Sequence, residues 1–401
     1  MQGGTVLRVV ITNSKMPTDS ENIVAKISSN VFYKEFTFDK NDFYPEDGNK
    51  ELADTVLWLE DLLFVIQVKE RKPSEVKSAT EENKWFKNKV LKRAKEQIGN
   101  SIDFFNKYEK IEIKNIRNHT LDISKANLNG VNKVIVYSPN SSFISTGNKS
   151  IKFYESTKSG NIHIFNLEDY LWVCKFLITP TELDEYLKFR ERIYLKHKEK
   201  VINYPEQYLL GHFLNTDDES FIQEEYIETF SKLIDDIEDF DVSGILTNFL
   251  EKIRIESQRT SQDYYSILTE IAILKRYELI EFKKRFTQMI DDVKSSKFSM
   301  PYRFTISRTG CGFVFIPLLQ DKVEYWENAL LNFTQIYKYK RRLNKCLGVI
   351  TFKTDEFFDI NWALIKNDWS FNNELDEAVK NESEFYGKEE FMQAERYRIK
   401  E

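Results

Sequence analysis

Two short apolar runs separated by only two polar residues constrain the fold of this chain more than any other feature. The first run spans Ala53 to Leu59 and the second spans Leu62 to Val68, with Glu60 and Asp61 between them. Apolar runs of strand length with such a short polar break are typical of a β-hairpin. The second run begins with five consecutive apolar residues, so we expect its strand to be buried on both faces of a sheet.

The hairpin predicts which side chains lie opposite one another. A two-residue turn after Leu59 places Asp54 directly opposite Gln67, and a four-residue loop with the same centre gives the same register. Cross-strand partners lie on one face of a sheet with their Cβ atoms about 5 Å apart. Lys69 shares the face of Gln67 because side chains alternate along a strand. We therefore expect a carboxylate, an amide and an amine to lie together at one end of the hairpin.

These groups have the chemistry of a divalent metal site. The carboxylate of Asp54 and the side-chain carbonyl oxygen of Gln67 are hard donors that suit Mg²⁺ or Mn²⁺, and the main-chain carbonyl of Val68 could be a third ligand. Such an ion lowers the pKa of a bound water, and Lys69 could orient that water or stabilise charge on a phosphorane. The alternative is a solvated hairpin end with an incidental Asp–Lys salt bridge, which is worth little when exposed.

Asp54 followed by Gln67-Val68-Lys69 across a hairpin resembles the PD-(D/E)XK nuclease superfamily, and most closely its QxK variant in Mrr-type restriction endonucleases. The resemblance covers roughly residues 15 to 200. It implies an α/β restriction-endonuclease-like domain, a mixed sheet flanked by helices, with Asp54, Gln67 and Lys69 as catalytic residues. The order of expected elements matches: helix 18–28, strand 32–38, hairpin 53–69 and helix 81–105. The chain departs from the family pattern in having Gln at 67 and no Pro before Asp54.

Under this resemblance Glu21 would be the acidic residue on the first helix. The segment Thr18-Asp-Ser-Glu21 is also a capping box, in which Glu21 reaches back to the amide of Thr18. Both interpretations remain open at this point.

The helix expected over 81–105 offers a basic surface beside the hairpin. Residues 69 to 97 contain ten Lys or Arg against five Glu, a local net charge of +5. Contacts to a phosphate backbone need such a patch, although charge runs more often coat a solvated helix face. Lys89, Arg93 and Gln97 recur at intervals of four and could face the sheet edge. Family members often have an assisting Lys or Gln on this helix, so these three are further candidates.

The remainder of the chain suggests a regulatory region. The strand–helix alternation ends near residue 200, residues 201–300 have a largely helical pattern, and residues 301–401 have an α+β pattern with a charged tail. The chain of 401 residues carries a net charge of −6, so any nucleic-acid binding must rest on a local patch. No apolar run approaches the ~20 residues of a membrane helix. Three scattered cysteines indicate a reducing, cytoplasmic location.

The resemblance implies a Mg²⁺-dependent (or Mn²⁺-dependent) endonuclease that hydrolyses phosphodiester bonds, with DNA favoured over RNA as the substrate, and a role in bacterial defence or restriction. The C-terminal region would regulate it or bind a protein partner or a second copy of the chain. One alternative is a catalytically inactive scaffold that keeps the nuclease fold to bind DNA or protein. Another is an interaction protein of unrelated enzymology whose helical half docks an ATPase.

Overall fold

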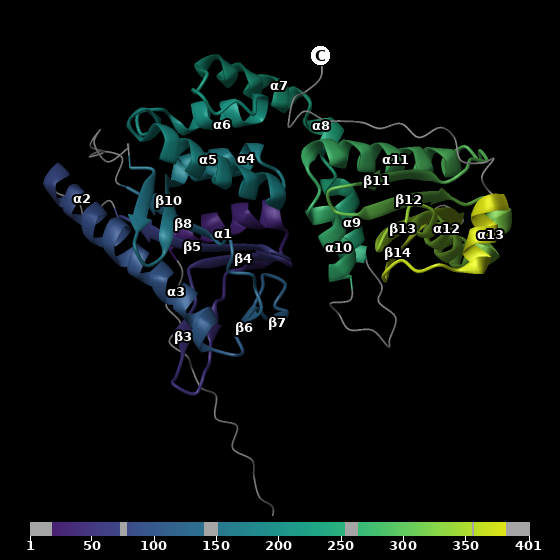
Figure 1. Ribbon diagram of the computed structural model, residues 1–401, viewed down its shortest axis with the longest axis horizontal. Helices are drawn as coiled ribbons and strands as arrows, with labels where there is room; N and C mark the ends of the chain where they lie inside the picture. Colours follow the sequence, from purple (N-terminus) through teal and green to yellow (C-terminus); the bar gives the residue numbers. More distant parts are fainter. Residues whose placement is uncertain (1–17, 73–77, 140–150, 253–263, 355–356, 382–401) are drawn as a thin grey trace, which may run out of the picture.

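The computed structural model describes residues 18–72, 78–139, 151–252, 264–354 and 357–381, which form two larger sheets joined by a helical region (Figure 1). The first sheet is mixed, with the strand order β1-β4-β5-β8-β10-β9. β4 runs antiparallel to β5, whereas β5, β8 and β10 are parallel. The strands are β1 (Thr37–Phe38), β4 (Thr55–Leu59), β5 (Leu62–Glu70), β8 (Asn132–Ser138), β9 (Phe153–Ser156) and β10 (Gly160–Asn166). The predicted α/β class, a mixed sheet flanked by helices, is therefore confirmed.

Helices cover the two faces of this sheet with different apolar residues. One face packs against α1 (Asp19–Phe32), α4 (Leu167–Phe176) and α5 (Pro180–Val201). The residues of β5 on this face are Phe64, Ile66 and Val68. The opposite face packs against one long helix, which consists of α2 (Ala79–Trp85), η2 (Phe86–Ala94) and α3 (Lys95–Lys107). Alternation along β5 therefore places Gln67 and Lys69 on the face of the long helix.

The first helix is longer than the sequence pattern predicts, and the strand expected over 32–38 is wrong for most of its length. α1 continues to Phe32, and only Thr37–Phe38 pair with β4. The helix extends to Phe32 because Val24, Val31 and Phe32 lie on one buried helical face. The chain then turns at residues 33–36, where Tyr33 has a positive φ of 61°, so these residues do not continue as a strand.

The middle segment of the long helix, η2, is a π-helix. Its buried residues, Phe86, Val90 and Ala94, recur strictly every four residues, and Ile98 continues the series in α3. In an α-helix of 3.6 residues per turn, a spacing of four rotates the apolar stripe away from the sheet by about 40° at each step. The wider π turn counters that rotation, so the stripe stays on the sheet across this segment.

The helical region shares one continuous apolar core with the first sheet. That core extends from Val24 in α1 through Leu268 to Val349 in the second sheet. The region consists of α6 (Glu206–Asn215), η4 (Glu224–Glu228), α7 (Thr229–Asp235), α8 (Ile237–Phe240), α9 (Ser243–Lys252), α10 (Tyr265–Ala272) and α11 (Arg276–Lys294). The helical pattern predicted for residues 201–300 is thus observed within the described part.

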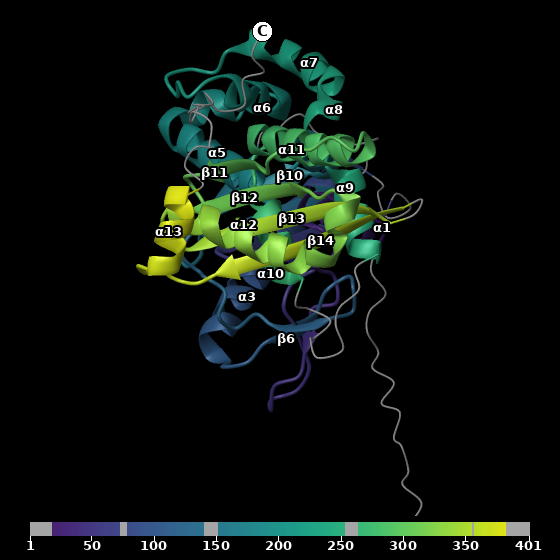
Figure 2. The same ribbon diagram turned by 90° about the vertical axis from the view of Figure 1, so that its right-hand side faces the viewer.

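The second sheet has four strands in the order β11-β12-β13-β14. They are β11 (Tyr302–Ile306), β12 (Cys311–Pro317), β13 (Lys345–Thr354) and β14 (Phe357–Lys366). α11 packs on one face and α12 (Trp326–Lys340) packs on the other (Figure 2). The short η5 (Gln320–Tyr325) precedes α12, and α13 (Asn373–Asn381) lies against it.

The two sheets share one order of elements. In each, a helix is followed by an antiparallel pair of strands, a second helix, and a strand that runs parallel to the second strand of the pair. These elements are α1-β4-β5-α3-β8 in the first sheet and α11-β11-β12-α12-β13 in the second. In the second hairpin the closing pair is Ile306 and Cys311. In the first hairpin, where the closing pair is Leu59 and Leu62, the polar residues are Asp54, Gln67 and Lys69. At the same distances from the closing pair, the second hairpin has Pro301, Ile316 and Leu318. The polar groups therefore occur in the first hairpin, and apolar residues or proline stand at the corresponding positions of the second.

Two small two-stranded sheets lie beside α3: β2 (Asp42–Phe43) with β3 (Lys50–Glu51), and β6 (Glu112–Lys114) with β7 (Thr120–Asp122). Among the described helices, none combines the length and the apolar composition required to cross a membrane.

A group of buried charges joins the first sheet to the helical region. The carboxylate of Glu206 accepts hydrogen bonds from Arg190 Nε at 2.6 Å, Lys152 Nζ at 2.8 Å and the hydroxyl of Tyr186 at 2.5 Å. Arg190 and Glu206 are each only 1% exposed. Burial alone would raise the pKa of Glu206, but Arg190 and Lys152 hold that pKa well below its ordinary value. The carboxylate therefore stays ionised in the core and balances two buried cations.

Asp169, in the first turn of α4, makes the stability of this region depend on pH. Burial, and then the Glu206 carboxylate, raise the pKa of Asp169 to about 6, whereas an unfolded Asp has a pKa near 3.9. Because the folded-state pKa is the higher one, the stability associated with the neutral carboxyl is fully present below about pH 4 and is lost as pH rises through about 6. We expect Asp169→Asn to raise the free energy of unfolding at neutral pH by up to about 3 kcal/mol, and to change it little near pH 4.

Urea unfolding of the wild-type protein and the Asp169→Asn variant at the two pH values tests this expectation. A stability difference that is the same at both pH values would contradict it.

Candidate active site

The hairpin has the register that the sequence predicts. Thr55 pairs with Ile66, and Leu59 pairs with Leu62 across the two-residue turn. Asp54 immediately precedes β4, so continuing this register places it opposite Gln67. The turn requires a positive φ of 50° at Glu60, a left-handed conformation that two-residue hairpin turns use. The apolar strands and the short turn thus fix the position of the polar end.

Three oxygen atoms at that end converge on one point, and the ammonium of Lys69 occupies it. Lys69 Nζ lies 3.1 Å from Asp54 Oδ2, 3.2 Å from Gln67 Oε1 and 2.7 Å from the carbonyl oxygen of Val68. Asp54 Oδ2 also accepts a hydrogen bond from the main-chain N–H of Val68 at 2.6 Å. The structure therefore brings together the three oxygens that the sequence proposed as metal ligands, and it brings Lys69 to the same place.

These groups are largely withdrawn from water. The side chain of Asp54 is 6% exposed, that of Lys69 is 15% exposed, and Gln67 is 2% exposed. A salt bridge of this kind differs from the solvated pair of the alternative interpretation, because polar groups in such a setting must satisfy each other or a ligand. Of the three side chains, that of Lys69 is the most exposed.

The donor set suits a hard divalent cation, although it is poor in charge. Oxygens from a carboxylate, an amide and a main-chain carbonyl are typical ligands of Mg²⁺ and Mn²⁺. Asp54 is the single carboxylate among the three, and the described residues contain no group of three or more His, Cys, Asp or Glu side chains placed to hold a metal ion. Mg²⁺ bonds oxygen at about 2.0–2.1 Å, so the three oxygens would have to close in from their present positions around the ammonium.

Gln97 on α3 supplies a further oxygen close to the hairpin. Its Oε1 is buried and has no hydrogen-bond partner among the described residues, which is unusual for a buried polar atom. One helical turn further on, the Ser101 hydroxyl donates to the carbonyl of Leu52, two residues before Asp54. Gln97 therefore lies on the helix face that is turned toward the hairpin, as the sequence analysis proposed.

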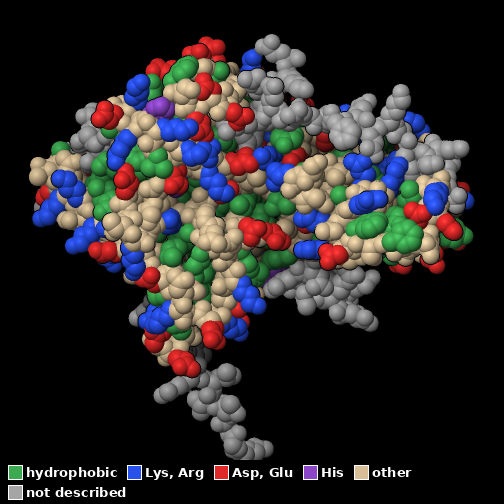
Figure 3. Space-filling model, viewed as in Figure 1, with side chains coloured by type: hydrophobic (Ala, Val, Ile, Leu, Met, Phe, Trp, Pro, Cys, Tyr) green, Lys and Arg blue, Asp and Glu red, His purple; other side chains and the backbone are tan. Residues whose placement is uncertain are grey.

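Lys89 and Arg93, by contrast, do not face the sheet. Both side chains are exposed, because Phe86, Val90 and Ala94 occupy the sheet-facing side of η2. The expected orientation of these two residues is therefore wrong. They belong instead to an exposed row of cations on the long helix, the cationic stripe, which consists of Lys84, Lys87, Lys89, Lys92 and Arg93. Figure 3 shows Lys and Arg side chains gathered at the left edge of the molecule, where α2 begins the long helix.

Glu21 has the capping role. Its carboxylate accepts a hydrogen bond from the Thr18 amide at 2.6 Å, and its own amide donates to the Thr18 hydroxyl at 3.3 Å. The helix that carries it packs against the side of β5 that bears Phe64, Ile66 and Val68, which is opposite to the side that bears Gln67 and Lys69. We therefore leave Glu21 out of the candidate site, and the correction follows from the alternation of side chains along β5.

Sequence reasoning missed a second ion pair at the end of β5. Arg71 Nε lies 3.5 Å from Glu82 Oε2, and the Glu82 side chain is only 3% exposed. Arg71 extends the sheet by donating its amide hydrogen to the carbonyl of Ser138. The sequence offers little to distinguish Glu82 from its exposed neighbour Glu81, because only the docking of α2 buries one of the two.

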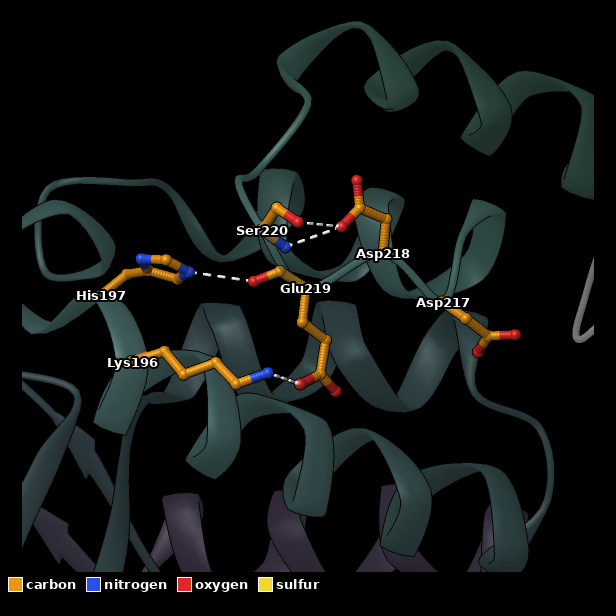
Figure 4. Close-up of a pocket in the computed structure, with 6 residues that line it drawn as sticks. All are labelled: Lys196, His197, Asp217, Asp218, Glu219 and Ser220. Atoms are coloured by element: carbon orange, nitrogen blue, oxygen red, sulfur yellow. Dashed lines mark hydrogen bonds and ion pairs between the residues drawn. The ribbon is translucent and has the colours of Figure 1, made fainter.

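A shallow hollow elsewhere on the surface has no comparable chemistry. It lies between α5 and the loop after α6, and is lined by Lys196, His197, Asp217, Asp218, Glu219 and Ser220 (Figure 4). Lys196 Nζ lies 2.6 Å from Glu219 Oε2, and the Ser220 hydroxyl lies 2.5 Å from Asp218 Oδ1. Its charges are thus largely engaged with one another, and the hairpin remains the candidate site.

Comparisons with family models, with curated proteins and with solved structures find no match for this chain. A function for this chain is therefore inferred from the geometry of the hairpin.

Proposed function

We propose that this chain is a metal-dependent nuclease that hydrolyses phosphodiester bonds of DNA at the hairpin end formed by Asp54, Gln67 and Lys69. The observation that carries the proposal is the convergence of Asp54 Oδ2, Gln67 Oε1 and the Val68 carbonyl oxygen on one cation, at 2.7–3.2 Å from Lys69 Nζ. Three oxygens arranged around a positive charge are a basic requirement of a metal site.

Each residue has a role in this proposal. Asp54, Gln67 and the Val68 carbonyl would hold Mg²⁺ or Mn²⁺, and Gln97 Oε1 is a candidate for a further ligand or for a hydrogen bond to its water. When bound, such an ion activates water and offsets charge on the phosphate. Lys69, at the exposed rim of the cluster, would orient the attacking water or donate to the developing negative charge on the phosphate oxygens.

The cationic stripe supports nucleic acid as the substrate class. Its five side chains are exposed, and no ion pair is found for them within the described part of the chain. Exposed cations without protein partners are suited to phosphate contacts. The same long helix carries Gln97 on the side that is turned toward the hairpin, whereas the stripe lies on its exposed side. Under this proposal the C-terminal region, whose hairpin lacks these polar groups at the corresponding positions, regulates cleavage or binds a partner.

One observation favours an inactive nucleic-acid-binding scaffold as the second candidate. The ammonium of Lys69 already satisfies all three oxygens, and the single carboxylate provides little charge to attract a divalent ion. A protein that had lost cleavage could keep this arrangement as a structural ion pair.

Cleavage of plasmid DNA in Mg²⁺ or Mn²⁺ separates the two candidates. We expect the wild-type protein to nick or linearise the plasmid, a chelator to stop the reaction, and Asp54→Asn to lower the rate by about 100-fold or more because the only carboxylate ligand is lost. Asp61→Asn is a matched control, since Asp61 is an exposed residue in the turn of the same hairpin. Equal cleavage by the wild-type protein and Asp54→Asn would reject the site, and absence of cleavage on DNA and RNA substrates would favour the scaffold.

A further inference from the structure

The Lys69 ammonium has a complete set of partners. An ammonium has three N–H donors, and the three oxygens lie at hydrogen-bond distance from Nζ. Two of these oxygens belong to the neighbouring residues Gln67 and Val68, so the Lys69 side chain folds back over its own strand. This arrangement places the positive charge at the point where the three oxygens converge.

A divalent ion and the ammonium cannot occupy that point together. An ion bonded to the same oxygens at about 2.0–2.6 Å would lie where Nζ now lies. Two positive charges so close together, in a largely buried setting, would also repel strongly. The cluster is already neutral, because the charge of Asp54 is balanced by Lys69. The folded site therefore attracts a divalent ion weakly until Lys69 leaves it.

Lys69 has a route out of the site. Its side chain is the most exposed member of the cluster, at 15%, and it lies near the end of β5. Rotation about its own side-chain bonds would move the ammonium without a change in the main chain. A phosphate of bound nucleic acid would offer the displaced ammonium a new anionic partner.

We propose that Lys69 acts as an internal competitor for the divalent ion, and that binding of nucleic acid draws it away and so admits the metal. This inference rests on the proposed function, and it adds a regulation of the same site. Metal and DNA then bind cooperatively, since each binding event favours the same displaced position of Lys69. The Lys69 ammonium thus excludes divalent ions from the site before DNA binds, and the same ammonium assists the reaction afterwards.

Titration of Mn²⁺ into the protein, followed by calorimetry or by the electron paramagnetic resonance of free Mn²⁺, tests the proposal without any cleavage. We expect Lys69→Met to bind Mn²⁺ at least about tenfold more tightly than the wild-type protein, because the competing charge is gone. Lys72→Met is a matched control that removes an exposed charge three residues further along the chain and should leave the affinity close to that of the wild-type protein. A short phosphorothioate duplex should tighten Mn²⁺ binding to the wild-type protein and not to Lys69→Met.

The outcomes separate this inference from the proposed function. If the wild-type protein and Lys69→Met bind Mn²⁺ with equal affinity, and Asp54→Asn abolishes binding in each, Lys69 does not compete with the metal, although the metal site itself stands. If neither protein shows Mn²⁺ binding that is abolished by Asp54→Asn, the metal site itself is rejected. Lys69→Ala is a second variant for the case that Lys69→Met fails to fold, and the thermal unfolding midpoint of each variant checks its integrity.

Discussion

Replacing Glu206 with alanine is expected to lower the free energy of unfolding by about 3–5 kcal/mol, because it leaves two buried cations without their counter-charge. Arg190 and Lys152 both donate to this carboxylate and are 1% and 5% exposed. The Arg190 guanidinium also stacks over Phe165 at 3.9 Å, so it cannot reach water without disturbing the core. This is the largest effect on stability that we expect from a single substitution.

Urea unfolding at neutral pH measures this effect. Glu155→Gln provides the control, because Glu155 pairs with Lys198 at the surface, where both side chains are more than half exposed. That variant should unfold at nearly the wild-type urea concentration. A loss of stability for Glu206→Ala no larger than that of Glu155→Gln would show that the buried group does not hold the sheet to the helical region.

Reversing the charge of the cationic stripe is expected to have the largest effect on binding. The triple variant Lys87→Glu, Lys89→Glu and Lys92→Glu should weaken binding to duplex DNA by about 100-fold or more at moderate salt, and should lower the dependence of log K on log salt by about 3. The three side chains are exposed on η2, so their replacement leaves the apolar face of the helix unchanged.

Fluorescence anisotropy with a labelled duplex at several salt concentrations provides the measurement. A control variant reverses Lys322, Lys353 and Lys366, which are exposed around the second sheet. It has the same total charge as the stripe variant, so it separates local contacts from net charge. Equal weakening in the two variants would contradict a specific role for the long helix.

The sequence predicted the hairpin and its register because these depend on local chain geometry. Two apolar runs and a two-residue break leave one natural way to pair the strands, and the position of Asp54 opposite Gln67 follows by counting. The capping box of α1 is equally local, and its two hydrogen bonds involve residues three apart in the chain.

Other features depend on contacts between distant residues, which a pattern along the chain does not contain. The orientation of Lys89 and Arg93 is an exception, because the apolar series Phe86, Val90 and Ala94 in the sequence already places these two cations on the exposed side of the helix. The buried group of Lys152, Arg190 and Glu206 joins residues 16 to 54 positions apart. The burial of Glu82 likewise depends on how α2 docks against the end of β5.

The nuclease proposal therefore rests on the part of the structure that local geometry determines most strongly. The structure adds that Lys69 Nζ lies among the three proposed ligand oxygens. That position gives the Asp54 carboxylate and the two neighbouring oxygens a hydrogen-bond partner in a largely buried site.

Anomalous X-ray scattering from Mn²⁺, in a crystal of the protein bound to a short phosphorothioate duplex, tests the central claim most directly. The account predicts a peak about 2.0–2.6 Å from the Asp54 carboxylate and the Gln67 carbonyl oxygen, with the Lys69 ammonium moved onto a phosphate. Density for Lys69 still bonded to all three oxygens, with DNA bound and Mn²⁺ absent from that point, would contradict it.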